Sequence, residues 1–89
     1  MISERLMATE HQVEVLYFAS LRDAAGCAQE SVRTSAANVA ALYLELQGRH
    51  GFRFAPERLR AAINGAFVAW DTPLQADAEV AFLPPVSGG

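Results

Sequence analysis

Apolar and polar side chains alternate along several short stretches of the chain, and one stretch follows a helical period instead. The alternation predicts strands over residues 13–18, about 28–33, 60–63, 66–70 and 79–83. Asn64-Gly65 joins the third and fourth of these, and this pair is typical of a two-residue hairpin turn. Residues 20–26 predict a short helical turn, with Ser20 as a possible N-cap and Gly26 as its end.

One long helix is predicted between the second and third strands. Asn38, or less favourably Ser35, is suited to cap its start, and Gly51 after His50 is suited to end it. Its apolar stripe consists of Val39, Leu42, Tyr43 and Leu46. The order strand, turn, strand, helix and three strands predicts an α+β roll, with one mixed sheet covered on one face by the main helix. This order is similar to the ubiquitin-like β-grasp arrangement, in which the first and last strands pair in parallel.

The phase of the strands divides their side chains between two faces of the sheet. The face toward the helix is predicted to carry Val15, Tyr17, Val68, Trp70, Val80 and Phe82. The opposite face then carries Leu16, Phe18, Phe67 and Leu83, and the chain has no second long helix to cover it. Such an apolar patch is typical of an interaction surface. The alternatives are a loop over residues 53–59 that covers the patch, or a phase that is wrong by one residue.

The sequence ends on Pro84-Pro85-Val86-Ser87-Gly88-Gly89, directly after the last predicted strand. Proline cannot donate to a sheet ladder, so the pair ends the strand and directs the chain away. Glycine has no Cβ and can enter a channel too narrow for any other residue. We therefore expect residues 84–89 to present the carboxylate of Gly89 to a partner, although a frayed terminus has a similar composition.

Composition limits the remaining possibilities. The chain has 89 residues, enough for a single domain, which we place at residues 12–83 after a flexible leader over 1–11. A net charge of −3 without a basic run makes nucleic acid an improbable partner. The sequence contains no lysine, so the chain cannot form isopeptide-linked polymers with itself. One cysteine, and no apolar stretch of signal-peptide or membrane-span length, predict a cytoplasmic protein without membrane contact.

Residues that could form an active site are sparse. His50 falls in the last turn of the predicted helix, where it suits the helix dipole better than a metal or catalytic site. Cys27 lacks the spacing of a zinc site, and Arg22-Asp23 is as compatible with a solvated pair as with a partner contact. We expect no metal, no bound cofactor and no active site within the chain itself.

Three segments carry a resemblance to a known family. Residues 15–23 (VLYFASLRD), 61–65 (AAING) and 79–89 (EVAFLPPVSGG) are similar to the small, sulfur-carrier subunits of molybdopterin synthases. The resemblance implies a β-grasp fold. It also implies that an ubiquitin-activating-like adenylyltransferase uses ATP to adenylate Gly89, and that the acyl-adenylate becomes a thiocarboxylate.

The resemblance further implies how that sulfur is used. The tail would enter the large subunit of a heterotetramer and donate sulfur to cyclic pyranopterin monophosphate, which forms the molybdopterin dithiolene. Phe18, Phe67 and Leu83 match the family's docking surface, next to Leu16 and the tail residues Pro84, Pro85, Val86, Ser87 and Gly88. On this interpretation the chain is a non-catalytic sulfur donor, and the acid and base groups belong to the large subunit.

Three alternatives stay open from the sequence. The chain could serve another sulfur pathway, such as thiamine thiazole synthesis, because that class shares the terminal Gly-Gly. It could be a ubiquitin-like modifier attached to lysines of other proteins. It could also be an interaction domain whose tail is inert.

Overall fold

A computed structural model of the chain describes residues 10–85. Most of the expected leader, and the tail from Val86 to Gly89, lie outside the described residues. The elements are β1 (His11–Tyr17), α2 (Ala19–Ala25), β2 (Gln29–Thr34), α3 (Val39–His50), a 3₁₀ turn η1 (Pro56–Arg58), β3 (Arg60–Ile63), β4 (Ala66–Val68) and β5 (Glu79–Leu83). No helix in the described part is long and apolar enough to cross a membrane.

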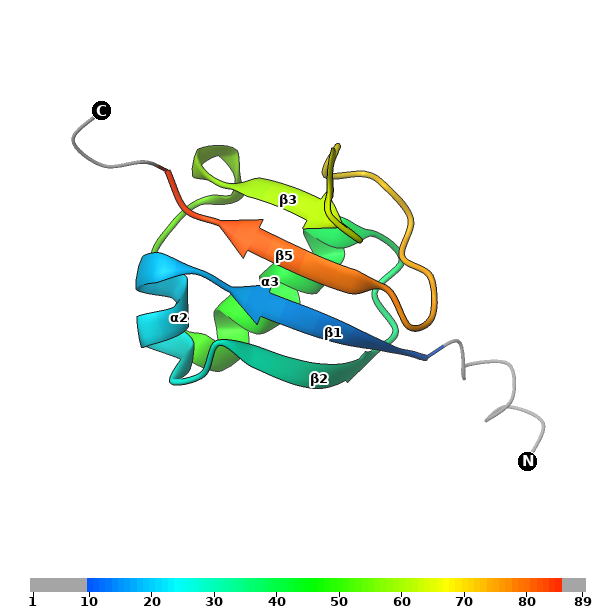
Figure 1. The fold of residues 1–89 in the computed structure, drawn as a ribbon, viewed down its shortest axis with the longest axis horizontal. Coiled ribbons are helices and arrows are strands. Elements are labelled where there is room, and N and C mark those ends of the chain that lie inside the picture. Colours follow the sequence, from blue (N-terminus) through cyan, green and yellow to red (C-terminus); the bar gives the residue numbers. More distant parts are fainter. Residues whose placement is uncertain (1–9, 86–89) are drawn as a thin grey trace.

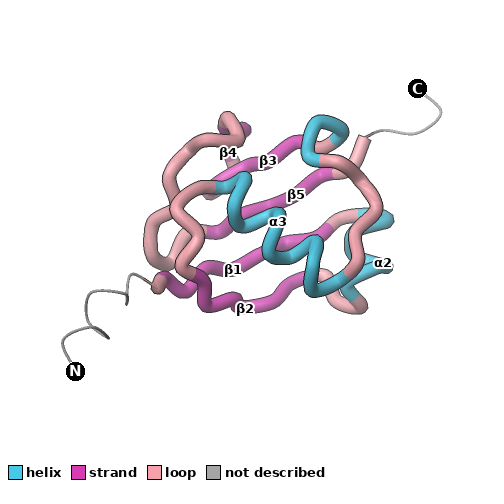
Figure 2. The backbone as a smooth tube through the Cα atoms, turned by 180° about the vertical axis from the view of Figure 1, so that it is seen from behind, coloured by secondary structure: helices cyan, strands magenta, loops and turns pink. Residues whose placement is uncertain are grey.

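The strands form one mixed sheet in the order β2-β1-β5-β3-β4. β1 and β5 pair in parallel at its centre, and the other neighbours are antiparallel. The sheet faces the viewer in Figure 1 with α3 behind it, and Figure 2 shows α3 crossing the strands from the other side. The expected α+β roll, with its parallel central pair and its single long helix on one face, is confirmed.

Helix α3 begins and ends where its sequence predicts. Asn38 is the N-cap, and its Oδ1 accepts a hydrogen bond from the backbone N–H of Ala41 at 2.9 Å. Gly51 ends the helix in the left-handed region at φ 74°, which glycine adopts without a steric penalty. The four stripe residues are fully buried against the sheet: Val39, Leu42, Tyr43 and Leu46. Packing of this stripe supplies most of the stability of a helix of this length.

The predicted phase of the strands is correct. Val15, Tyr17, Val80 and Phe82 are buried in the core between sheet and helix. Val68 and Trp70 are only partly buried, but they pack against that core. The ring of Trp70 stacks on Phe82 with centroids 6.0 Å apart, so the aromatic side chain closes the core on the β4 side.

Several boundaries differ from the predicted ones. β1 begins earlier, because His11 and Gln12 pair with Thr34 and Arg33 of β2. β4 stops at Val68 instead of Trp70. The carbonyl of Trp70 accepts a hydrogen bond from the backbone N–H of Ala40 at 2.9 Å. This bond gives a partner to one of the free N–H groups in the first turn of α3, so Trp70 does not continue the strand ladder.

The short helix α2 also starts differently. Its N-cap is Phe18 in extended conformation, with no side-chain capping bond, and the predicted N-cap Ser20 lies inside the helix. Ala19 has a φ of 52°, so the chain turns sharply as it leaves β1. Gly26 ends the helix in the left-handed region as expected. The turn at Ala19 places Phe18 at the end of the central strands, outside any strand.

Candidate functional site

An apolar row crosses the face of the sheet that α3 leaves uncovered. The register places Leu16 of β1 opposite Ala81 of β5, Ala81 opposite Ala62 of β3, and Ala62 opposite Phe67 of β4. Leu83 lies one row further along β5, and Phe18 follows directly after β1. We call Leu16, Phe18, Phe67 and Leu83 the apolar patch. Phe18 and Phe67 are 44% and 61% exposed, so the patch is open to a partner.

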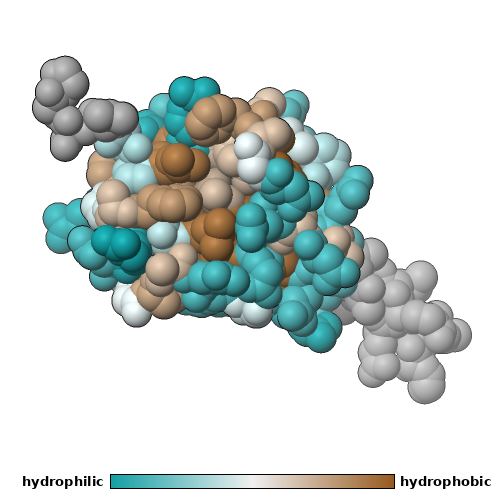
Figure 3. All heavy atoms as spheres, viewed as in Figure 1, coloured by the Kyte–Doolittle hydropathy of each residue, from teal (hydrophilic) through white to brown (hydrophobic). Residues whose placement is uncertain are grey.

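The opposite end of the same face is polar. Glu14 lies opposite Glu79 on β5 and Ser31 on β2. Ser31 donates a hydrogen bond to Glu14, and Gln29 donates another at 3.0 Å. These bonds, that of Ser31 first, lower the pKa of the Glu14 carboxyl below its usual value. Figure 3 shows the result: apolar atoms gather on the side of the face from which the C-terminal chain departs, and hydrophilic atoms cover the other side.

A groove connects the apolar patch with the start of the tail. It has a volume of about 360 Å³ and is lined by Glu57, Arg58, Leu59, Arg60, Phe67, Leu83, Pro84 and Pro85. The loop that carries η1 therefore forms one wall of the groove. It does not cover the patch, because Phe67 keeps its exposure. The guanidinium carbon of Arg60 lies 4.2 Å from the centroid of the Phe67 ring.

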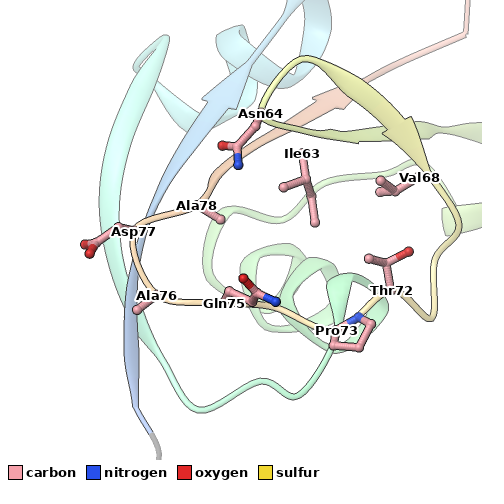
Figure 4. A pocket seen from close by; sticks show the side chains of 9 residues that line it. All are labelled: Ile63, Asn64, Val68, Thr72, Pro73, Gln75, Ala76, Asp77 and Ala78. Atoms are coloured by element: carbon pink, nitrogen blue, oxygen red, sulfur yellow. The ribbon is translucent and has the colours of Figure 1, made fainter.

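A second hollow lies at the other end of the sheet, where β5 begins. It has a volume of about 290 Å³ and is lined by Ile63, Asn64, Val68, Thr72, Pro73, Gln75, Ala76, Asp77 and Ala78. Figure 4 shows that the side chain of Asp77 points away from the other lining residues. The Oδ1 of Asn64 accepts from the backbone N–H of Glu79 at 2.9 Å. This hollow has neither a charged group aimed into it nor a connection to the tail.

A polar cluster lies on the helix-facing side, beneath the end of β1. The hydroxyl of Tyr17 donates to Glu30 Oε2 at 2.5 Å, and His50 Nε2 lies 2.7 Å from the same oxygen. Burial opposes the charge on Glu30, but the hydrogen bonds from Tyr17 and His50 outweigh it, so the pKa of Glu30 is lowered. Burial, and then the bond to Glu30, raise the pKa of Tyr17.

The sequence analysis missed this cluster. It placed His50 in the last helical turn, where the residue lies, but it did not identify Glu30 as its partner. The sequence does contain a signal for the cluster, because the alternation of side chains puts Tyr17 and Glu30 on the core side of two adjacent strands. Glutamate on the core side of a strand requires a donor.

The structure places the other candidate residues at the surface or against the core. Cys27 is a half-buried free thiol packed against the core. Arg22 and Asp23 are exposed on α2 and form no ion pair with each other. Within residues 10–85, no group of three histidine, cysteine, aspartate or glutamate side chains could hold a metal ion.

The sequence matches one known protein family over most of its length. Residues 15–89 match the model of the ThiS family, so the match runs from β1 through the final Gly-Gly. The chain belongs to the ThiS family. A curated ThiS relative is the molybdopterin synthase sulfur carrier subunit of Escherichia coli (strain K12), which is 35% identical over 80 residues, 86% of this chain and 99% of the relative.

Solved structures place this ThiS protein among ubiquitin-like β-grasp proteins, which confirms the predicted fold. SAMP1 from Haloferax volcanii, a small archaeal modifier protein, superimposes with a TM-score of 0.69 at 29% identity, over 88% of this chain and 99% of that one. A protein–protein complex of subunits 1 and 2 of the molybdopterin-converting factor from Helicobacter pylori 26695 contains a chain that matches with a TM-score of 0.59 at 26% identity, over 88% of this chain and 99% of that one. The chain is thus a homologue of molybdopterin synthase sulfur carrier subunits.

Proposed function

We propose that this chain is the sulfur-carrier subunit of a molybdopterin synthase and that it carries sulfur as a thiocarboxylate on Gly89. The observation that supports this most directly is the position of the apolar patch. Leu83 ends β5 within the patch, and Pro84 and Pro85 continue from it along the groove toward the last residues. A partner seated on Phe18, Phe67 and Leu83 is therefore next to the start of the tail.

The chemistry follows from the weak reactivity of a carboxylate. In the proposal, an oxygen of the Gly89 carboxylate attacks the α-phosphate of ATP in an activating enzyme, and pyrophosphate leaves. Sulfur at the oxidation level of sulfide then attacks the acyl carbon of the adenylate, AMP leaves, and a thiocarboxylate results. The thiocarboxylate sulfur is a soft nucleophile that attacks a carbon of the pterin precursor, where a carbon–oxygen bond breaks. Water then hydrolyses the acyl–sulfur bond, which leaves the sulfur on the pterin and returns the Gly89 carboxylate. ATP is bound by the activating enzyme and not by this chain.

The large subunit of the synthase is the proposed partner of the apolar patch. The match to a chain of the Helicobacter pylori complex supports this pairing. The ionisable side chains that line the groove at the start of the tail are Glu57, Arg58 and Arg60, with no histidine among them. We therefore assign proton transfer to the large subunit, in a heterotetramer of two large and two small subunits, and expect the assembly in the cytoplasm.

The test is the intact mass of the protein coexpressed with its activating enzyme. Replacement of one terminal oxygen by sulfur adds about 16 mass units. Oxidation of a methionine adds nearly the same mass, so fragmentation must locate the change at Gly89. Incubation with the large subunit and the pterin precursor should then return the mass to that of the carboxylate. A mass that stays unmodified in the presence of an active activating enzyme and sulfur donor contradicts the proposal.

The similarity to SAMP1 supports a second candidate function, attachment of Gly89 to lysines of other proteins. The absence of lysine excludes only chains built on this protein itself. High-mass, Gly89-linked adducts on a blot of cell extract favour the modifier function. Copurification with a thiazole synthase instead of the large subunit favours the thiamine pathway.

A further inference from the structure

One positive charge lies inside the apolar patch. Arg60 pairs with Leu83 across β3 and β5, so both side chains lie on the uncovered face. The Arg60 guanidinium is held over the ring of Phe67, 4.2 Å from its centroid. A guanidinium stacked on an aromatic ring loses little further freedom when it forms a hydrogen bond, so it is suited to recognise an anion.

This charge has no anionic partner among the described residues. The ion pairs within residues 10–85 join Arg33 to Glu10, Arg49 to Glu45 and His50 to Glu30. Glu57 lines the same groove as Arg60 but lies beyond ion-pair distance of it. The groove therefore presents, next to Phe67 and Leu83, a guanidinium without an anionic partner in residues 10–85.

A protein that covers the patch must remove water from this guanidinium. Burial of an arginine without an acceptor costs more free energy than a typical apolar contact contributes. A carboxylate that accepts two parallel hydrogen bonds from the guanidinium offsets this cost and fixes the orientation of the partner. A partner without that carboxylate is disfavoured, which makes the position a determinant of specificity.

We propose that Arg60 selects the large subunit by pairing with an aspartate or glutamate of that subunit, placed opposite the ring of Phe67. This inference rests on the proposed function, because it takes the large subunit as the occupant of the patch. The carboxylate contacts Arg60 from the solvent side, while apolar side chains around it cover Phe67 and Leu83. The charged pair then lies beside the point where Pro84 leads the tail into the partner.

The experiment measures the affinity of the large subunit from the same genome for the wild-type chain and three variants, at low and high salt. Arg60→Glu reverses the charge, and Arg60→Met removes it while keeping a long apolar side chain. Arg33→Glu is the matched control, because Arg33 lies on β2 at the far edge of the same sheet, exposed and paired only with Glu10 at the surface. Thermal unfolding shows whether each variant keeps the fold.

We expect Arg60→Glu to weaken binding by roughly 100-fold or more and Arg60→Met by roughly 10-fold or more, with Arg33→Glu close to wild type. The affinity of the wild type should fall more steeply with salt than that of Arg60→Met. An Arg60→Met variant that binds as tightly as the wild type, or more tightly, overturns the inference but leaves the proposed function intact. A wild-type chain that does not bind the large subunit overturns both.

Discussion

At the scale of single residues, the two faces of the sheet give the same amino acid opposite roles. Phe82 of β5 is fully buried and contacts Tyr43 and Trp70, whereas Phe67 of β4 is 61% exposed and contacts the guanidinium of Arg60. Burial of Phe82 stabilises the domain itself. Phe67 has most of its ring available to stabilise a complex.

Substitution of Phe82 should lower the stability of the domain, whereas substitution of Phe67 should weaken binding to the partner. Phe82→Ala should lower the free energy of unfolding by about 3–5 kcal/mol, because it leaves a cavity between sheet and helix. Phe67→Ala should change that free energy by less than about 1 kcal/mol and weaken binding to the large subunit by roughly 10-fold or more. Urea unfolding and titration calorimetry measure the two effects. A Phe67→Ala domain that binds like the wild type would remove the patch from the proposed interface.

At the scale of elements, α3 carries one residue that helix formation does not favour. Gly48 lies exposed within the helix, and a Cβ built on it meets nothing within 4 Å. Gly51 also has free space around it, but its φ of 74° disfavours any residue with a Cβ. Space alone therefore does not distinguish the two glycines, whereas their backbone conformations do.

Substitution of these glycines by alanine should have opposite effects. Gly48→Ala is expected to raise the free energy of unfolding by about 0.5–1 kcal/mol, because alanine has less backbone freedom to lose. Gly51→Ala should lower it by about 1 kcal/mol, since the left-handed conformation is strained for alanine. Denaturant titration of both variants measures the difference. Equal effects would show that α3 does not end at Gly51 in solution.

The polar cluster joins three elements through one carboxylate. Glu30 of β2 accepts from Tyr17 of β1 and is bonded to His50 at the end of α3. Its pKa is lowered in the folded protein, where burial is outweighed by these hydrogen bonds. A lowered carboxyl pKa stabilises the fold above the unfolded-state value and loses this effect as pH falls through the folded-state value.

Glu30→Gln should therefore destabilise the domain in a pH-dependent way. We expect a loss of about 1–2 kcal/mol at pH 7, because the bonds to a charged acceptor are replaced by weaker ones. The difference from the wild type should shrink as the pH falls through the lowered pKa of Glu30 in the folded wild type, where its carboxyl also becomes protonated. Unfolding free energies measured from pH 3 to 7 test this. A difference that does not vary with pH would show that Glu30 acts by packing alone.

At the scale of the whole molecule, local chemistry determined most of the fold. Asn38, the Asn64-Gly65 pair, Gly51 and the alternation in residues 79–83 each predict an element that the structure contains. These signals depend on neighbours in sequence, so they can be identified without the tertiary structure. The same signals also predict the uncovered face, because a single long helix can cover only one side of the sheet.

The features that sequence analysis missed depend on contacts between distant segments. The end of β4 is set by a bond from Ala40 to the carbonyl of Trp70, and the start of α2 by the turn at Ala19. Glu30 and His50 meet only after β2 and α3 have packed together. The stacking of Arg60 on Phe67 requires β3 and β4 to be in register. Alternation can place a residue on one face of the sheet, as it does for Glu30, but it does not identify the distant residue that the side chain contacts.

The proposed carriage of sulfur on Gly89 predicts how changes at this residue act. Deletion of Gly89, or addition of one residue after it, moves the carboxylate by about 3.5 Å, and we expect sulfur transfer to be lost. The thermal unfolding midpoint should stay unchanged, because residues 11–83 form the sheet and helices. The same residue added before Met1 is the control and should leave transfer intact. Full transfer by the deleted form would contradict the role of Gly89.

The parallel pairing of β1 with β5 has a consequence for the proteolysis of incomplete chains that lack β5. These two strands come from distant parts of the sequence, and without β5 the hairpin β3–β4 has no hydrogen-bonded link to β1–β2. Such a half-assembled sheet exposes unsatisfied edges and invites proteolysis. A chain truncated before β5 would therefore be degraded. It would not accumulate as a protein that lacks the C-terminal residues and competes for the binding partner.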